Sequence, residues 1–281
     1  MKTAICVVMF VLVLGAGAHA ETRMEQPTEL THKQKVVALL KSIETGSTAP
    51  LSYIDPAKYI QHNLSVPDGL AGFSNLLKQL PSNSTKVNTM RVFQDGEYVF
   101  AHSAYNFSGP KIGFDIFRFE NGKIVEHWDN LQVTARHNPS GHSMIDGTTR
   151  IKDLHKTKAN KALVSGFAEN ILINGKMDEL AAYFAGDNYI QHDPLIPDKV
   201  SGLRKVLDEW RKQGIIMKYH TIHQVLGEGN FVLVVSEGYT AGKHDSFYDL
   251  FRVEHGKIAE HWDVIEDIPA KKKWKNNNGK F

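Results

Sequence analysis

The chain contains the same long segment twice. Tyr59–His62 recurs as Tyr189–His192, 130 residues later, and Asp115–Asp129 recurs as Asp249–Asp263, 134 residues later. The period is close to half of the 281-residue chain, far longer than the units of a solenoid. The repeat therefore predicts two copies of one domain, with loops between the matching blocks that differ by about four residues.

Within each copy, helical spacing of apolar residues comes first and strand-like segments follow. Asn121-Gly122 and His255-Gly256 separate the last two strands of the copies, as expected for tight type I′ hairpins. Helices followed by an antiparallel sheet form an α+β pattern. In the second copy we expect helices at 158–173, 177–184 and 201–213, and strands at 219–226, 231–239, 246–254 and 257–265.

Residues 1–20 are predicted to be a secretory signal peptide. Lys2 precedes an apolar run over residues 3–15, and the segment ends in Ala18-His19-Ala20. We expect cleavage after Ala20 and a secreted chain that is free of the membrane. The single cysteine, Cys6, lies in this segment, so a disulfide framework is excluded.

The remaining boundaries are read from composition. The copies are placed at 31–133 and 157–268, with a polar linker at 134–156 and a basic tail at 269–281 that we expect to be solvated. Three N-glycosylation sequons begin at Asn63, Asn83 and Asn106, all in the first copy.

Charge and motif content exclude several classes of protein. Lys and Arg number 33 against 31 Asp and Glu, so the net charge of +2 argues against nucleic-acid binding. His220 and His223 lie three apart on a predicted strand and therefore face opposite ways, which disfavours a zinc site. With no Gly-rich phosphate loop in the sequence, we predict no cofactor and no metal.

The repeated motifs carry a resemblance to a known family. Tyr-Ile-Gln-His followed by Asp-Ile/Leu-Phe-Arg, Gly-Lys-Ile and Glu-His-Trp-Asp resembles the SnoaL-like polyketide cyclase group of the NTF2-like superfamily, across nearly all of each copy. The resemblance implies two tandem cones. In each, a curved antiparallel sheet wraps around about three helices, and a pocket opens at the wide end. It also implies that the two repeats pair as an internal pseudo-dimer.

That group includes aldol-type cyclases, and its relatives include isomerases, epoxide hydrolases and non-catalytic binding modules, so the fold alone does not fix a reaction. We predict acid–base chemistry on a small hydrophobic carbonyl compound. Asp249 interrupts an aromatic strand and is the expected base, because burial raises a carboxyl pKa. The other catalytic candidates are His192, His223 and Asp263, and the ligand-binding candidates are Tyr189, Gln191, His261, Trp262, His62 and Asp115.

Alternatives remain open at this point. Asp249 can equally be a satisfied structural carboxylate, and Trp262 can be core packing. A two-residue hairpin places Asp249 opposite Trp262, so Asp249 reaches Asp263 only if a β-bulge intervenes. Met90 stands where the second copy has His223, which favours the second copy as the working site and a degenerate first copy.

Two rival functions are carried forward. One is a non-enzymatic secreted carrier or matrix protein that holds a small hydrophobic ligand. The other is an epoxide hydrolase with an Asp–Arg–Asp cluster. Arg252 lies three residues from Asp249, on the opposite face of the strand, and counts against that cluster.

Overall fold

The computed structural model describes residues 29–81 and 84–281. The predicted signal peptide, its cleavage site, Cys6 and the sequon residue Asn83 lie outside the described residues. Among the described helices, none combines the length and apolar character needed to cross a membrane.

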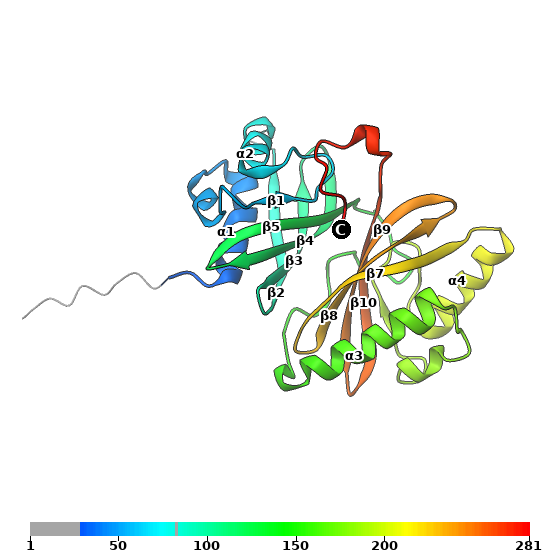
Figure 1. Ribbon diagram of the computed structural model, residues 1–281. Helices are drawn as coiled ribbons and strands as arrows, with labels where there is room; N and C mark the ends of the chain where they lie inside the picture. The colour runs from blue at the N-terminus through cyan, green and yellow to red at the C-terminus, as the bar shows by residue number, and fades with distance from the viewer. Residues whose placement is uncertain (1–28, 82–83) are drawn as a thin grey trace, which may run out of the picture. The chain divides into compact units, whose positions relative to one another are not determined.

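The first repeat builds a five-stranded sheet with strand order β1-β5-β4-β3-β2 (Figure 1). Two α-helices and a short 3-10 helix accompany this sheet. In chain order the elements are α1 (His32–Thr45), η1 (Ala49–Tyr53), β1 (Ile60–Gln61), α2 (Gly69–Gln79), β2 (Lys86–Asp95), β3 (Tyr98–Asn106), β4 (Pro110–Glu120) and β5 (Lys123–Val133).

The second repeat builds the equivalent sheet, in the order β6-β10-β9-β8-β7. Its elements are η2 (Leu154–Lys156), α3 (Thr157–Phe167), η3 (Ala168–Ile173, a π-helix), η4 (Leu180–Tyr183), β6 (Ile190–Gln191), α4 (Val200–Lys212), β7 (Met217–Glu228), β8 (Phe231–Thr240), β9 (Lys243–Glu254), β10 (Lys257–Asp267) and η5 (Lys271–Lys273). The α+β class is thereby confirmed, with two five-stranded sheets that are each accompanied by helices.

Each sheet is mixed, not purely antiparallel as expected from the sequence. β1 runs parallel to β5, and β6 runs parallel to β10. Each of these two-residue strands is a short extended piece that precedes a helix. The hairpin prediction is confirmed: Asn121, Gly122, His255 and Gly256 all have positive φ, as a type I′ turn requires.

A bulge in each last hairpin decides which side chains meet. The register of β9 against β10 shifts between Ile258 and Glu260, and Asp249 consequently pairs with Asp263. In the first repeat the shift lies between Arg118 and Phe119, and there Asp115 pairs with Asp129. The bulge that a two-carboxylate arrangement needs is therefore present twice.

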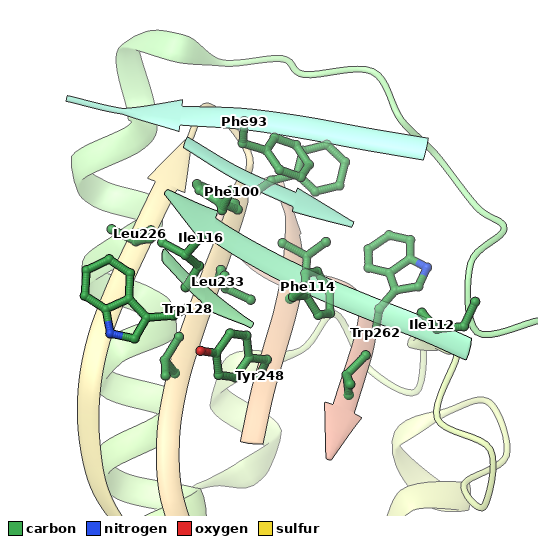
Figure 2. Close-up of a cluster of buried hydrophobic side chains, with 14 of the residues drawn as sticks. Phe93, Phe100, Ile112, Phe114, Ile116, Trp128, Leu226, Leu233, Tyr248 and Trp262 are labelled. Atoms are coloured by element: carbon green, nitrogen blue, oxygen red, sulfur yellow. The ribbon is translucent and has the colours of Figure 1, made fainter. Parts of the chain in front are cut away.

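The two faces of each sheet pack differently. One face packs against the helices of its own repeat, forming a separate apolar cluster in each half. The opposite faces share a third cluster that contains residues of both repeats, among them Phe100, Trp128, Tyr248 and Trp262 (Figure 2). The Asn130 side-chain amide donates to Ser246 O and Val264 O, 2.8 and 2.9 Å away, and joins the two sheets.

The linker and the tail are both packed against the sheets. Met144 is buried, and Trp262 donates its indole N–H to Asp146 O. The tail is solvated only in part: Lys271–Lys273 are exposed as expected, but Asn276 and Lys280 are buried and bond to backbone carbonyls of the first repeat. The linker and the tail each contact both repeats: Arg91 of β2 donates to Ile145 O and Thr148 O, and Phe281 stacks on His223 of β7.

Candidate active site

A chain of three polar side chains crosses the helix-facing side of the first sheet. His127 Nδ1 lies 3.0 Å from Gln61 Oε1, and His127 Nε2 lies 3.1 Å from Asp115 Oδ1. Tyr105 donates its hydroxyl hydrogen to the other oxygen of Asp115. β1 supplies the glutamine, β5 the histidine and β4 the aspartate, so the sheet itself positions the chain.

The hydrogen bonds fix where the protons lie. Gln61 Oε1 also accepts from the backbone N–H of Asn63, so it is an acceptor and His127 Nδ1 must carry a hydrogen. One proton then remains to be shared between His127 Nε2 and Asp115 Oδ1. Burial raises the pKa of Asp115, while the hydrogen bond from His127 acts in the opposite direction.

Asp129 lies across the strand pair from Asp115 and keeps one oxygen free. Its Oδ2 accepts from Asn63 Nδ2 at 2.6 Å, whereas its buried Oδ1 has no hydrogen-bond partner among the described residues. An unpaired buried carboxylate oxygen is costly in a folded protein. Such an oxygen is available to a ligand.

These groups line a cavity of about 320 Å³. Its apolar wall comes from α1 and α2 and includes Leu40, Ile43, Phe73, Leu76 and Leu80. Gln61, Tyr105, Asp115, His127 and Asp129 supply polar groups. Glu266, from the last strand of the second repeat, also lines the cavity and is bonded by Lys280. An apolar cavity with a few converging polar groups is the usual form of a small-molecule site.

The second repeat reproduces the same polar chain. His261 Nδ1 lies 2.9 Å from Gln191 Oε1, and His261 Nε2 lies 3.0 Å from Asp249 Oδ1. Here Tyr219, on a different strand from the one that carries Tyr105, donates to Asp249 at 3.2 Å. Tyr189 accepts from the Gln191 amide and so holds the glutamine in place.

The second carboxylate of the second repeat has a different partner. Asp193 occupies the position of Asn63, beside Asp263. Burial, with the Asp193 carboxylate adding to it, raises the pKa of Asp263 well above its usual range. The Asp193 carboxylate thus disfavours ionisation of Asp263, whereas Asp129 accepts a hydrogen bond from the Asn63 amide.

The two interiors also differ in how they are filled. Phe247 is fully buried and packs against Tyr219 with ring centroids 4.3 Å apart, beside Asp249. The equivalent position in the first repeat is Gly113, paired with Ser103 as Phe247 is paired with Ser236. A larger cavity, of about 480 Å³, lies at the second repeat, and Tyr219 lines it but Asp249 does not.

Several residues singled out from the sequence lie on the opposite face of the sheet. His192 Nε2 bonds to Glu260, and its ring stacks on Trp262 at 4.6 Å. His62 stacks on Trp128 in the same way. The expectation that His192 is catalytic beside Asp249 is wrong, since His192 packs on Trp262, which faces the shared cluster and not the cone interior.

His223 does not reach the pocket either. It is exposed, its Nε2 bonds to Glu237, and its ring stacks on Phe281 at 3.8 Å. Two register shifts in β7, on either side of Thr221 and Ile222, lie between Tyr219 and His223 along that strand. The absence of this histidine at Met90 therefore says nothing about the first repeat, and the argument for a degenerate first copy loses its basis.

His127, Asp129, Tyr105 and Asn63 were not proposed for the chemistry from the sequence. The repeat itself carried the signal for two of them, because His127 and Asp129 align with His261 and Asp263. Asn63 was considered as a glycosylation site. Its side-chain nitrogen is committed to Asp129 in the fold, whereas Asn106 is exposed at the end of β3.

Among the residues that the structure describes, two clusters have the side-chain chemistry to hold a metal ion. The ligand atoms of Asp115, His127 and Asp129 lie within 4.8 Å of one another, as do those of His142, Asp146 and His192. Arg252, weighed above for an epoxide hydrolase, bonds to Glu260 and not to Asp249.

In the comparison with family models, the match lies within the second repeat. The model of the SnoaL-like domain matches residues 164–261. No curated protein matches the chain.

Solved structures match single repeats at low identity. An NTF2-like protein of unknown function from Cytophaga hutchinsonii is 14% identical over 38% of this chain and 95% of its own, with a TM-score of 0.34. An LEH-like epoxide hydrolase of M. tuberculosis is 20% identical over 40% and 85%, with a TM-score of 0.30. A protein with a ketosteroid isomerase-like fold from Catenulispora acidiphila is 15% identical over 35% and 85%, with a TM-score of 0.30. At these scores the likeness carries no functional argument.

Proposed function

We propose that the first repeat is an enzyme site for acid–base chemistry on a small hydrophobic carbonyl compound, of the aldol-cyclisation or isomerisation type. One observation carries the proposal: the free oxygen of Asp129 and the one-proton pair of Asp115 and His127 meet on one apolar cavity. Abstraction of a proton next to a carbonyl needs a base and a proton donor so arranged.

The proposed steps balance with one base and one donor. Asp129 Oδ1 takes a proton from the carbon next to the carbonyl; the C–H electron pair forms a carbon–carbon double bond, and the π pair of the carbonyl moves onto its oxygen. The proton shared by Asp115 and His127 stabilises that oxygen. In an isomerisation Asp129 returns its proton to another carbon of the same molecule. In a cyclisation the enolate carbon attacks a second carbonyl of that molecule, and Asp129 returns its proton to the alkoxide that forms there.

The surroundings suit this chemistry. Burial raises the pKa of Tyr105 well above its usual range, so its phenol stays neutral and continues to donate to Asp115. The cavity volume, about 320 Å³, lies at the low end for ligand sites and indicates a small molecule.

Hydrogen–deuterium exchange tests the proposal without knowledge of the natural substrate. 2-Tetralone is incubated with the protein in D₂O, and loss of the signals of the hydrogens next to the carbonyl is followed by proton NMR. Asp129→Asn keeps the shape and removes the acceptor, so the enzyme-dependent exchange should fall about 10²–10⁴-fold. Asp263→Asn, the matched change in the second repeat, should leave the exchange unchanged.

A carrier is the second candidate, and the largely apolar wall of the cavity in the first repeat favours it. A carrier would bind 2-tetralone, as a titration would detect, without any exchange above buffer. An epoxide hydrolase is less well supported, because Arg118 and Arg252 bond to Glu126 and Glu260 and not to the paired aspartates.

We also propose that the chain is secreted, on the strength of the sequence of residues 1–20 alone. N-terminal sequencing of material from the culture medium should then begin at Glu21. A cell-bound protein that retains Cys6 would contradict this.

A further inference from the structure

A second cluster of ligating side chains lies outside the cone. His142 and Asp146 come from the linker, and His192 comes from the end of β6, so the cluster joins two segments of the chain. His192 Nδ1 lies 2.9 Å from Asp146 Oδ1, and His142 Nδ1 lies 3.5 Å from Asp146 Oδ2. Such separations are close to those between neighbouring ligands of a tetrahedral metal ion, about 3.3 Å for metal–ligand bonds near 2.0 Å.

Each histidine has a carboxylate on its other ring nitrogen. His192 Nε2 lies 3.0 Å from Glu260 Oε1, and Arg252 in turn holds Glu260 at 2.6 Å. His142 Nε2 lies 3.4 Å from Asp198 Oδ2. Carboxylates in this place orient metal-bound histidines and raise their basicity.

The ring nitrogen Nδ1 of the buried His192 lies near two oxygen atoms, although it can carry only one hydrogen. His192 Nδ1 lies 2.8 Å from Ser143 O as well as 2.9 Å from Asp146 Oδ1, although a ring nitrogen carries at most one hydrogen. Its side chain is fully buried. A cation at this point would be held by the ring nitrogen and by the carboxylate together.

The first repeat offers an internal comparison. His62 has the same arrangement of Trp128 beneath its ring and Glu126 on Nε2, but its Nδ1 faces the backbone oxygen Gly279 O. The tail at that point is Asn-Asn-Asn-Gly-Lys, with neither histidine nor aspartate. The ligating side chains are therefore an addition of the linker and not a feature that both repeats need for folding.

We propose that His142, Asp146 and His192 bind one Zn²⁺ ion, which fixes the linker to the second repeat. Two imidazoles and one carboxylate, with a water or a carbonyl oxygen as the fourth ligand, form a donor set that zinc accepts. The site lies on the sheet face opposite Asp249 and is independent of the proposed reaction.

Calorimetry on the untagged full-length protein tests the site. After treatment with a chelator and its removal, titration with zinc chloride should give one ion per chain with a dissociation constant in the micromolar range or tighter. His142→Ala and Asp146→Asn should each weaken binding at least about tenfold. Both side chains are partly exposed, so neither variant threatens the fold. His137→Ala, an exposed linker histidine outside the cluster, is the matched control.

Two further measurements distinguish zinc bound by the linker from zinc bound inside the first cone. Zinc should slow proteolytic cutting between residues 136 and 152 in the wild-type protein and not in His142→Ala. Asp129→Asn should bind zinc as the wild type does. Absence of stoichiometric binding, or binding lost in Asp129→Asn but kept in His142→Ala, would overturn the proposal.

Discussion

The two repeats share one polar chain and differ in the space around it. Glutamine, histidine and aspartate are linked in the same order and at similar distances in both interiors. In the first repeat Tyr105 lies over Gly113, and a Cβ placed on that glycine would come within 3.1 Å of the Tyr105 ring. In the second repeat the glycine and the aromatic residue exchange strands: Gly238 stands at the position of Tyr105, and Phe247 stands at the position of Gly113.

The comparison shows that the hydrogen-bonded chain of glutamine, histidine and aspartate does not by itself create a ligand pocket. A hydrogen-bonded aspartate in a cone becomes a site only where a neighbouring side chain leaves room for a ligand. In the second repeat Phe247 stands at the position of Gly113, beside which the first repeat has the Tyr105 ring and Leu131. Asp263 has the Asp193 carboxylate beside it where Asp129 has the Asn63 amide, and Asp129 Oδ1 and Asp263 Oδ1 both lack a hydrogen-bond partner among the described residues. Both repeats keep the fold and the polar chain, but the cavity reaches the aspartate of that chain in the first repeat, whereas the cavity of about 480 Å³ at the second repeat does not reach Asp249.

The largest effect should come from removing the carboxylate of the polar chain in the first repeat, with the same change in the second repeat as its comparison. Asp115→Asn replaces the carboxylate that shares a proton with His127 by a neutral amide and should lower the exchange of 2-tetralone hydrogens about 10²–10⁴-fold. Asp249→Asn, the same change in the filled cone, should leave the NMR exchange rate within about twofold of wild type. Equal loss from both substitutions would show that both cones work.

Emptying the second cone is the next test. Phe247→Ala removes a fully buried ring and should lower the free energy of unfolding by about 3–5 kcal/mol, measured by urea denaturation. The space created lies beside Asp249, so calorimetry should detect a second binding site for 2-tetralone. A variant that loses the stability and gains no site would show that the interior collapses and that Phe247 does not control access.

A smaller effect is expected from the carboxylate pair of the second repeat. Asp193→Asn copies Asn63: its side-chain oxygen can still accept from Leu195 N, as Asn63 accepts from Ser65 N, and its nitrogen can donate to Asp263. The raised pKa of Asp263 means that folding favours its protonated form, so the stability from that proton is full in acid and is lost as the pH rises through the folded pKa.

The variant needs no such proton. Its free energy of unfolding should exceed that of the wild type by about 1–3 kcal/mol at pH 7, with little difference near pH 4. Denaturation at both pH values measures this. Asn63→Asp is the reciprocal change and should destabilise the first repeat at pH 7. A variant less stable than wild type at pH 7 would show that the Asp193 carboxylate does not disfavour ionisation of Asp263.

The sequence predicted the architecture well because the repeated motifs and the hairpin glycines can be recognised directly in the sequence. The strands of the second repeat fall within a few residues of the expected ranges, and helix 158–173 appears as α3 continued by a π-helix. The 177–184 segment contains only a short 3-10 helix. The buried part of the tail was misjudged because its contacts are with residues about 200 positions away, which no local pattern reveals.

The site was predicted in part. Asp115, Asp249, Gln191 and His261 were named and lie in the polar chains. Alternation along a strand assigns faces only while the register is regular, and bulges in β7 and β10 break it. The choice between the repeats rested on His223, whereas the feature that distinguishes the cavities is a glycine at position 113. A missing side chain gives no positive signal in a single sequence.

The smallest effect is expected at the residue that the sequence analysis favoured and the structure places outside the pocket. His223→Ala removes a ring that stacks on Phe281 and a bond to Glu237, both at an exposed strand. Loss of one such stacked pair should lower the free energy of unfolding by about 0.5–1.5 kcal/mol, measured by urea denaturation. The exchange of 2-tetralone hydrogens should stay within about twofold of wild type, because His223 faces neither cone. A drop comparable to that of Asp129→Asn would return the working site to the second repeat and refute the assignment of the chemistry to the first.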